Sequence, residues 1–139
     1  MRKLIIGLDP GTHCGVATLD TEAREFIHIE TLKLHTAQEL IKEYHRSGQL
    51  LLVRVEDARK RVWYGNAGRE RLQGAGSIKR DCAIWEDFLN FHKIPFQLVT
   101  PVRNATKLDK KTFTKLTGWT KRCSQHGRDA AGLLFRYFL

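Results

Sequence analysis

The first third of the chain alternates short apolar runs with turn residues, a pattern typical of β-strands. Lys3–Leu8 is apolar and β-branched, the segment Asp9-Pro10-Gly11-Thr12 interrupts it, and Gly15–Leu19 resumes it. We interpret the glycines here as residues that force a tight hairpin. The extended run Glu25–Leu34 follows. The three runs predict an antiparallel meander.

The rest of the chain predicts alternating helices and strands. The segment Thr36-Ala37-Gln38-Glu39 matches a capping box, so we expect a helix to begin there and to end at Gly48. The continuous apolar run Leu50–Val55 is typical of a strand buried on both faces. Further on we expect a helix from about Leu72 to Phe91, a strand at Pro95–Val99, a short helix at Lys110–Leu116, and a C-terminal helix capped by Ser124. The order βββαβαβαα predicts an α/β fold with a mixed sheet and helices packed against it.

Length and charge indicate one basic domain. With 139 residues, 42% of them hydrophobic, the chain can bury one core of ordinary size, so we expect residues 1–139 to form a single domain. The 24 Lys and Arg residues outnumber the 15 Asp and Glu residues, and the formal charge of +9 favours a polyanionic partner. This length also excludes the two-lobed sugar-kinase ATPases, whose phosphate hairpin is similar to the first motif.

Location and redox state follow from the apolar runs and the cysteines. No apolar run approaches the roughly 20 residues of a membrane span. Cys14, Cys82 and Cys123 form neither an even disulfide set nor a Cys-x-x-Cys pair, so we expect them to be reduced. We therefore expect no membrane association and a location in bacterial or phage-infected cytoplasm, with an organelle as the alternative.

Acidic residues stand at the ends of two predicted strands and on the last predicted helix. A carboxylate at the end of a strand, such as Asp9, is fixed by the sheet and open to solvent, and could hold a divalent cation. Glu56 and Asp57 follow another strand, and only one of them can face the same site because successive strand residues point to opposite faces. His126 and Asp129, three residues apart, share one helical face. Two-metal phosphodiester hydrolysis needs several such carboxylates around cations about 4 Å apart.

Each of these positions also has a purely structural interpretation. Asp9 could satisfy the backbone amides of its own turn. The two acids after the apolar strand could form salt bridges with Arg54 or Arg59. Asp129 could serve as a capping or ion-paired residue of its helix. The residues alone leave these alternatives open.

Taken in order, the motifs resemble the catalytic set of RuvC-type Holliday junction resolvases, which belong to the RNase H-like superfamily. The resemblance rests on Gly-Leu-Asp9-Pro-Gly-Thr-x-x-Gly, a strand ending in Val-Glu56, and a helix carrying His126-x-x-Asp129-Ala. It implies an RNase H-like fold in which three acids, Asp9, Glu56 and Asp129, hold two Mg²⁺ or Mn²⁺ ions per active site. His126 would be a further ligand or an acid–base group. The resemblance also implies a homodimer that nicks a four-way DNA junction symmetrically.

Basic segments indicate where branched DNA would bind. Ala58–Arg71 is unusually basic and carries adjacent aromatics, and we expect an aromatic to stack on an unpaired base while the arginines contact phosphates. A later segment resembles the basic loop and short helix of the family. The candidate DNA-binding residues are Arg59, Arg61, Trp63, Tyr64, Arg69, Lys107, Lys110 and Lys111. The alternative for the two aromatics is that they anchor the loop to the core.

Two other functions are compatible with the same motifs. An RNA-processing nuclease of the same superfamily would keep the metal chemistry and change the substrate. A nucleic-acid-binding module without catalysis is the other alternative, although carboxylates that face phosphates without a metal would weaken binding.

Overall fold

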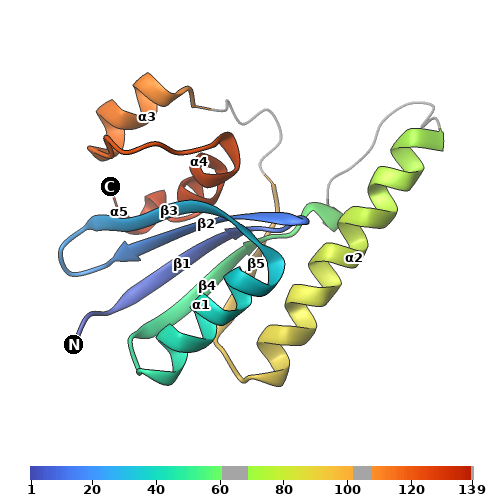
Figure 1. The fold of residues 1–139 in the computed structure, drawn as a ribbon, viewed down its shortest axis with the longest axis horizontal. Coiled ribbons are helices and arrows are strands. Elements are labelled where there is room, and N and C mark those ends of the chain that lie inside the picture. Colours follow the sequence, from blue (N-terminus) through green and yellow to red (C-terminus); the bar gives the residue numbers. More distant parts are fainter. Residues whose placement is uncertain (61–68, 102–107, 139) are drawn as a thin grey trace.

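A five-stranded mixed sheet forms the centre of the fold (Figure 1), in a computed structural model that describes residues 1–60, 69–101 and 108–138, with the backbone alone described for residues 60 and 69–75. The strands lie in the order β3-β2-β1-β4-β5. They are β1 (Leu4–Asp9), β2 (His13–Asp20), β3 (Glu25–Lys33), β4 (Leu50–Glu56) and β5 (Phe96–Val99). β1, β2 and β3 form the predicted antiparallel meander, and β4 and β5 extend the sheet in parallel to β1.

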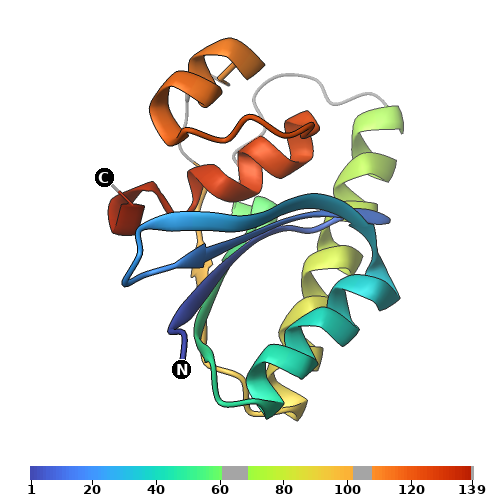
Figure 2. The ribbon, with the colours of Figure 1, turned by 60° about the vertical axis from the view of Figure 1, so that its left-hand side comes forward.

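Helices cover both faces of the sheet (Figure 2). The helices are α1 (Leu34–Arg46) and α2 (Arg69–Phe91) on one face, and α3 (Lys110–Thr117), α4 (Gln125–Gly132) and α5 (Phe135–Phe138) on the other. The 3-10 helix η1 (Ala58–Lys60) follows β4. None of the helices in the described part of the chain has the length and apolarity needed to cross a bilayer.

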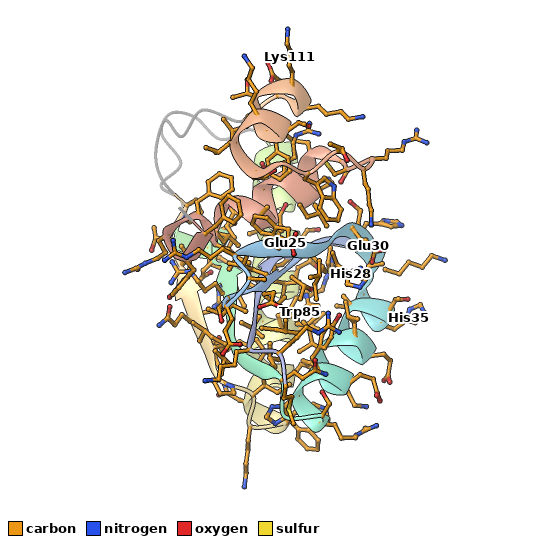
Figure 3. All side chains as sticks on the ribbon, turned by 90° about the vertical axis from the view of Figure 1, so that its left-hand side faces the viewer. Glu25, His28, Glu30, His35, Trp85 and Lys111 are labelled. Atoms are coloured by element: carbon orange, nitrogen blue, oxygen red, sulfur yellow. The ribbon has the colours of Figure 1, made fainter. Side chains whose placement is uncertain are left out.

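The two faces of the sheet enclose separate apolar cores. Ile6 and Leu8 of β1 point toward α1 and α2, where Trp85 is fully buried. Ile5 points to the opposite side, where it packs in a cluster with Phe113 of α3, as the alternation of strand side chains requires. Figure 3 shows Trp85 on one side of the sheet and Lys111 of α3 far on the other. The sheet is therefore buried on both faces, as the apolar strands predict.

The predicted capping box at Thr36 is wrong. β3 continues directly into α1, which begins at Leu34, and its N-cap residue Lys33 makes no side-chain capping bond. Burial of the helix face that carries Ala37 and Ile41 fixes this helix start, because packing outweighs a single cap. The predicted end is confirmed, since Gly48 follows the helix with a left-handed φ of 79°.

The prediction for the C-terminal helix is confirmed at its start. Ser124 caps α4 by accepting a hydrogen bond from the backbone N–H of Gly127, at 3.1 Å. The helix ends at Gly132, and the short α5 follows it. All three cysteines are free, as expected.

Candidate active site

Two glycines allow α4 to lie directly against the sheet. A Cβ atom on Gly7 of β1 would lie 2.1 Å from the carbonyl oxygen of Ala130, and one on Gly15 of β2 would lie 2.0 Å from that of His126. Since Cβ atoms essentially never come closer than 3.0 Å to such atoms, any other residue would force the helix away. The hydroxyls of Ser124 and Thr31 also hydrogen-bond to each other, which joins the start of α4 to β3.

This packing places α4 beside the end of β1 and brings three predicted site residues together. Ligand atoms of Asp9, His126 and Asp129 lie within 4.8 Å of one another. Nδ1 of His126 is 3.2 Å from Oδ2 of Asp9. The Asp9 side chain is only 16% exposed, whereas that of His126 is 62% exposed. Nε2 of Gln125 donates a 2.8 Å hydrogen bond to Oδ1 of Asp129, which orients that carboxylate.

Glu56 lines the same cleft as this cluster. β1 and β4 are parallel neighbours in which Leu8 pairs with Val55, so their carboxyl ends meet at one edge of the sheet. The cleft at this edge has a volume of about 640 Å³ and is lined by all four predicted site residues, Asp9, Glu56, His126 and Asp129. Three carboxylates and an imidazole therefore border one cleft.

Asp57, the neighbouring acid, is bound to Arg59. Its side chain is buried, and the Arg59 guanidinium donates to Oδ1 at 2.7 Å and to Oδ2 at 3.1 Å. A third bond, of 3.1 Å, joins Arg59 to Glu86 of α2. The hydrogen bonds with Asp57 raise the pKa of Arg59 further above its usual range. These contacts support the salt-bridge interpretation for Asp57 and leave Glu56 as the acid that faces the cleft.

The predicted DNA-binding residues are only partly described. Lys110 and Lys111 are exposed at the start of α3, and Figure 3 shows Lys111 there. The guanidinium of Arg59 is held by two carboxylates, as above, although a quarter of the side chain remains exposed. The other candidates, namely Arg61, Trp63, Tyr64, Lys107 and the side chain of Arg69, lie outside the described residues.

Three polar residues of this region were not among the predicted site residues. Gln125 orients Asp129, as described above, and nothing in the sequence indicated this contact. Arg128 donates to the carbonyl oxygens of Leu108 and Cys123, which joins α4 to the segments that flank α3. Arg54 lines the cleft beside Glu56. The sequence marks Arg54 only as a single charged residue within an apolar run.

The donor set fits a hard divalent cation. Carboxylate oxygens are the ligands that Mg²⁺ and Mn²⁺ prefer, and imidazole suits several transition metals. Three acids around one cleft repel each other, and a cation between them would relieve that repulsion. The cluster of Asp9, His126 and Asp129 is compact enough for one ion to contact all three residues. Glu56 lines the same cleft.

Comparisons with known proteins identify the fold. No protein-family model matches the sequence, and no curated protein matches it either. The structure is similar to that of Thermus thermophilus RuvC in complex with a Holliday junction substrate, with a TM-score of 0.60 and 15% identity over 98% of this chain and 94% of that one. A second T. thermophilus RuvC structure matches with a TM-score of 0.57 and 16% identity over 97% and 94% of the two chains. The predicted RNase H-like fold and its likeness to RuvC are thus confirmed.

Proposed function

We propose that this protein is a metal-dependent endonuclease that resolves four-way (Holliday) junctions and related branched DNA. One observation carries the proposal. Asp9, His126 and Asp129 converge within 4.8 Å in a cleft that Glu56 also lines, in a fold shared with a RuvC that was solved with a junction substrate. The net charge of +9 favours the same polyanionic partner.

Each site residue has a role in this proposal. Asp9, Glu56 and Asp129 would hold two Mg²⁺ or Mn²⁺ ions, with His126 as a further ligand or an acid–base group. When bound, the ions would supply Lewis-acid stabilisation and lower the pKa of the attacking water. The sheet fixes Asp9 and Glu56 at adjacent strand ends.

The residues of α4 complete the arrangement. Gln125 holds the Asp129 carboxylate in one orientation. His126 directs Nδ1 at Asp9, and its exposed ring can exchange a proton with solvent or substrate.

We further propose that the protein acts as a homodimer. The described residues contain one cluster of this kind. Symmetric nicking of a junction requires two such sites, and a two-fold dimer would present them to a nearly two-fold DNA branch.

Cleavage of a labelled four-way junction tests the proposal, beside linear duplex DNA and structured RNA, with Mg²⁺ or EDTA. We expect paired nicks in the junction for the wild type, and none with EDTA or in Asp9→Asn, because this change removes a ligand charge. Glu39→Gln, an exposed acid of α1, makes the same chemical change away from the cleft and should cleave normally.

The other outcomes are equally informative. Metal-dependent cutting of RNA, with every branched DNA left intact, would assign the protein to the RNA-processing nucleases. Tight junction binding without cleavage under any metal condition would overturn the nuclease proposal in favour of a binding module.

A further inference from the structure

Arg54 is a buried cation in the proposed active-site cleft. Its side chain belongs to β4 and is only 9% exposed. Nε donates a 2.9 Å hydrogen bond to the carbonyl oxygen of Leu133, and Nη1 donates a 2.6 Å bond to Oε1 of Gln97. Cζ lies 5.5 Å from the centroid of the Tyr137 ring. The guanidinium therefore lies where β4, β5, α4 and α5 meet.

The partners of Arg54 are electrically neutral. Burying a guanidinium is unfavourable unless its charge is compensated. The ion pairs among the described residues do not include Arg54. The carbonyl of Leu133, at the C-terminal end of α4, compensates part of the charge through the helix dipole. Nη2 makes no hydrogen bond with the described residues, so it retains donor capacity for an anion.

The cleft is lined by acidic and by basic side chains. Arg54 and Glu56 are two residues apart on one strand, so they share a face and their Cα atoms are about 7 Å apart. The lining also includes Arg136 of α5. Cζ of Arg136 also lies 5.5 Å from the centroid of the Tyr137 ring, so both guanidinium groups lie near this ring. A nucleic-acid strand with its scissile phosphate at the acids would place a neighbouring phosphate toward the arginines.

The geometry points to a phosphate subsite formed by Arg54 and Arg136, which binds the phosphodiester next to the scissile one. This inference rests on the proposed nuclease function and adds a residue-level account of how the strand is held. Arg54 provides a buried, preoriented guanidinium, and planar guanidinium groups match phosphate oxygens well. Arg136 is exposed and lines the same cleft. Both act on binding of the strand and neither touches the reacting atoms.

Salt dependence of DNA binding distinguishes this role from a structural one. Binding of a labelled four-way junction is measured by fluorescence anisotropy in EDTA, from low to moderate salt, for wild type, Arg54→Gln and Arg136→Gln. Log affinity falls as log salt rises, and each loss of a phosphate contact should reduce the steepness of this fall by about 0.7–0.9. We also expect roughly tenfold weaker binding at a fixed low salt.

Two further variants complete the test. Arg54→Lys keeps the charge and should restore most of the slope, though less of the affinity, because lysine lacks the forked donors. Arg46→Gln removes an exposed arginine from α1, on the other face of the sheet, and should bind as the wild type does. Thermal melting is recorded for all variants, since Arg54 also joins several elements.

One pattern of melting and binding results would overturn the proposed phosphate subsite. In this pattern, Arg54→Gln lowers the melting temperature but leaves the salt dependence of binding unchanged, and Arg136→Gln changes neither the melting temperature nor the salt dependence. Arg54 would then only stabilise the fold and would not bind a phosphate. Normal junction cleavage by the wild type in that case leaves the proposed function intact. A wild-type protein that neither binds branched DNA nor cleaves it with Mg²⁺ would overturn both proposals together.

Discussion

A single methyl group at Gly15 tests whether the packing of α4 on the sheet sets the geometry of the site. In Gly15→Ala the new Cβ would lie 2.0 Å from the carbonyl oxygen of His126, whereas ordinary contact begins at 3.4 Å. The helix must therefore move by the difference, about 1.4 Å, or β2 must move by as much. The atoms that collide are backbone on both sides, so a side-chain rotation cannot relieve the clash.

The displacement affects both stability and the acid cluster. Overpacking of this kind costs about 1–3 kcal/mol, which for a chain of this size lowers the melting temperature by roughly 3–10 °C. The contact of 3.2 Å between His126 and Asp9 cannot survive a shift of this size. Since a misplacement of about 1 Å can cost roughly 100-fold in rate, we expect junction cleavage to fall at least that far.

Melting temperature and junction cleavage are measured together with a matched control. Gly76→Ala makes the same change in α2, where nothing lies within 4 Å of the new Cβ. It should raise stability by up to about 1 kcal/mol, because alanine favours a helix over glycine, and leave cleavage unchanged. Wild-type melting and cleavage in Gly15→Ala would refute the reasoning, since α4 could then not rest on the backbone of β2.

Two further predictions concern charged groups outside the cluster. Asp57→Asn should lower the free energy of unfolding in urea by about 3 kcal/mol, because it breaks the buried pair with Arg59; a change near zero would show that the pair is not stabilising. At the start of α3, the hydrogen bond from the backbone N–H of Thr112 lowers the pKa of Asp109. A lowered folded-state pKa means that the stabilisation is complete above the ordinary value of 3.8 and disappears as the pH falls through the folded value. The stability difference between wild type and Asp109→Ala should therefore be constant near neutral pH and shrink in acid; a difference that persists in strong acid would contradict the capping role.

The strand ends were predictable from the sequence because they depend on local patterns. Asp9 and Glu56 each follow an apolar run, and parallel strands bring their carboxyl ends to one edge of a sheet. The choice between Glu56 and Asp57 was not predictable, because it depends on which residue continues the strand. The structure extends β4 through Glu56, and Asp57 turns away to bind Arg59.

Long-range packing could not be predicted from the sequence. Gly15 reads as a hairpin glycine, yet it lies within β2 without a left-handed φ, and its function is to admit the backbone of α4. Arg54 was considered only as a member of an apolar strand and as a possible salt-bridge partner of the acids that follow it, because its actual partners Leu133 and Gln97 are distant in sequence. Such contacts depend on which helix covers which strand, and no local period encodes that choice.

The precision of the proposed site therefore depends on the contacts of α4 rather than on its own helical stability. A helix of eight residues is too short to be stable alone in water. Ser124 fixes its start to β3, Arg128 joins it to the segments around α3, and Arg54 binds the carbonyl at its end. The two close glycine contacts then set its height above the sheet. Because His126 and Asp129 lie between these fixed points, their distance from the strand ends is determined by tertiary packing. This explains why residues that never touch the substrate should control the rate of the proposed metal-dependent reaction.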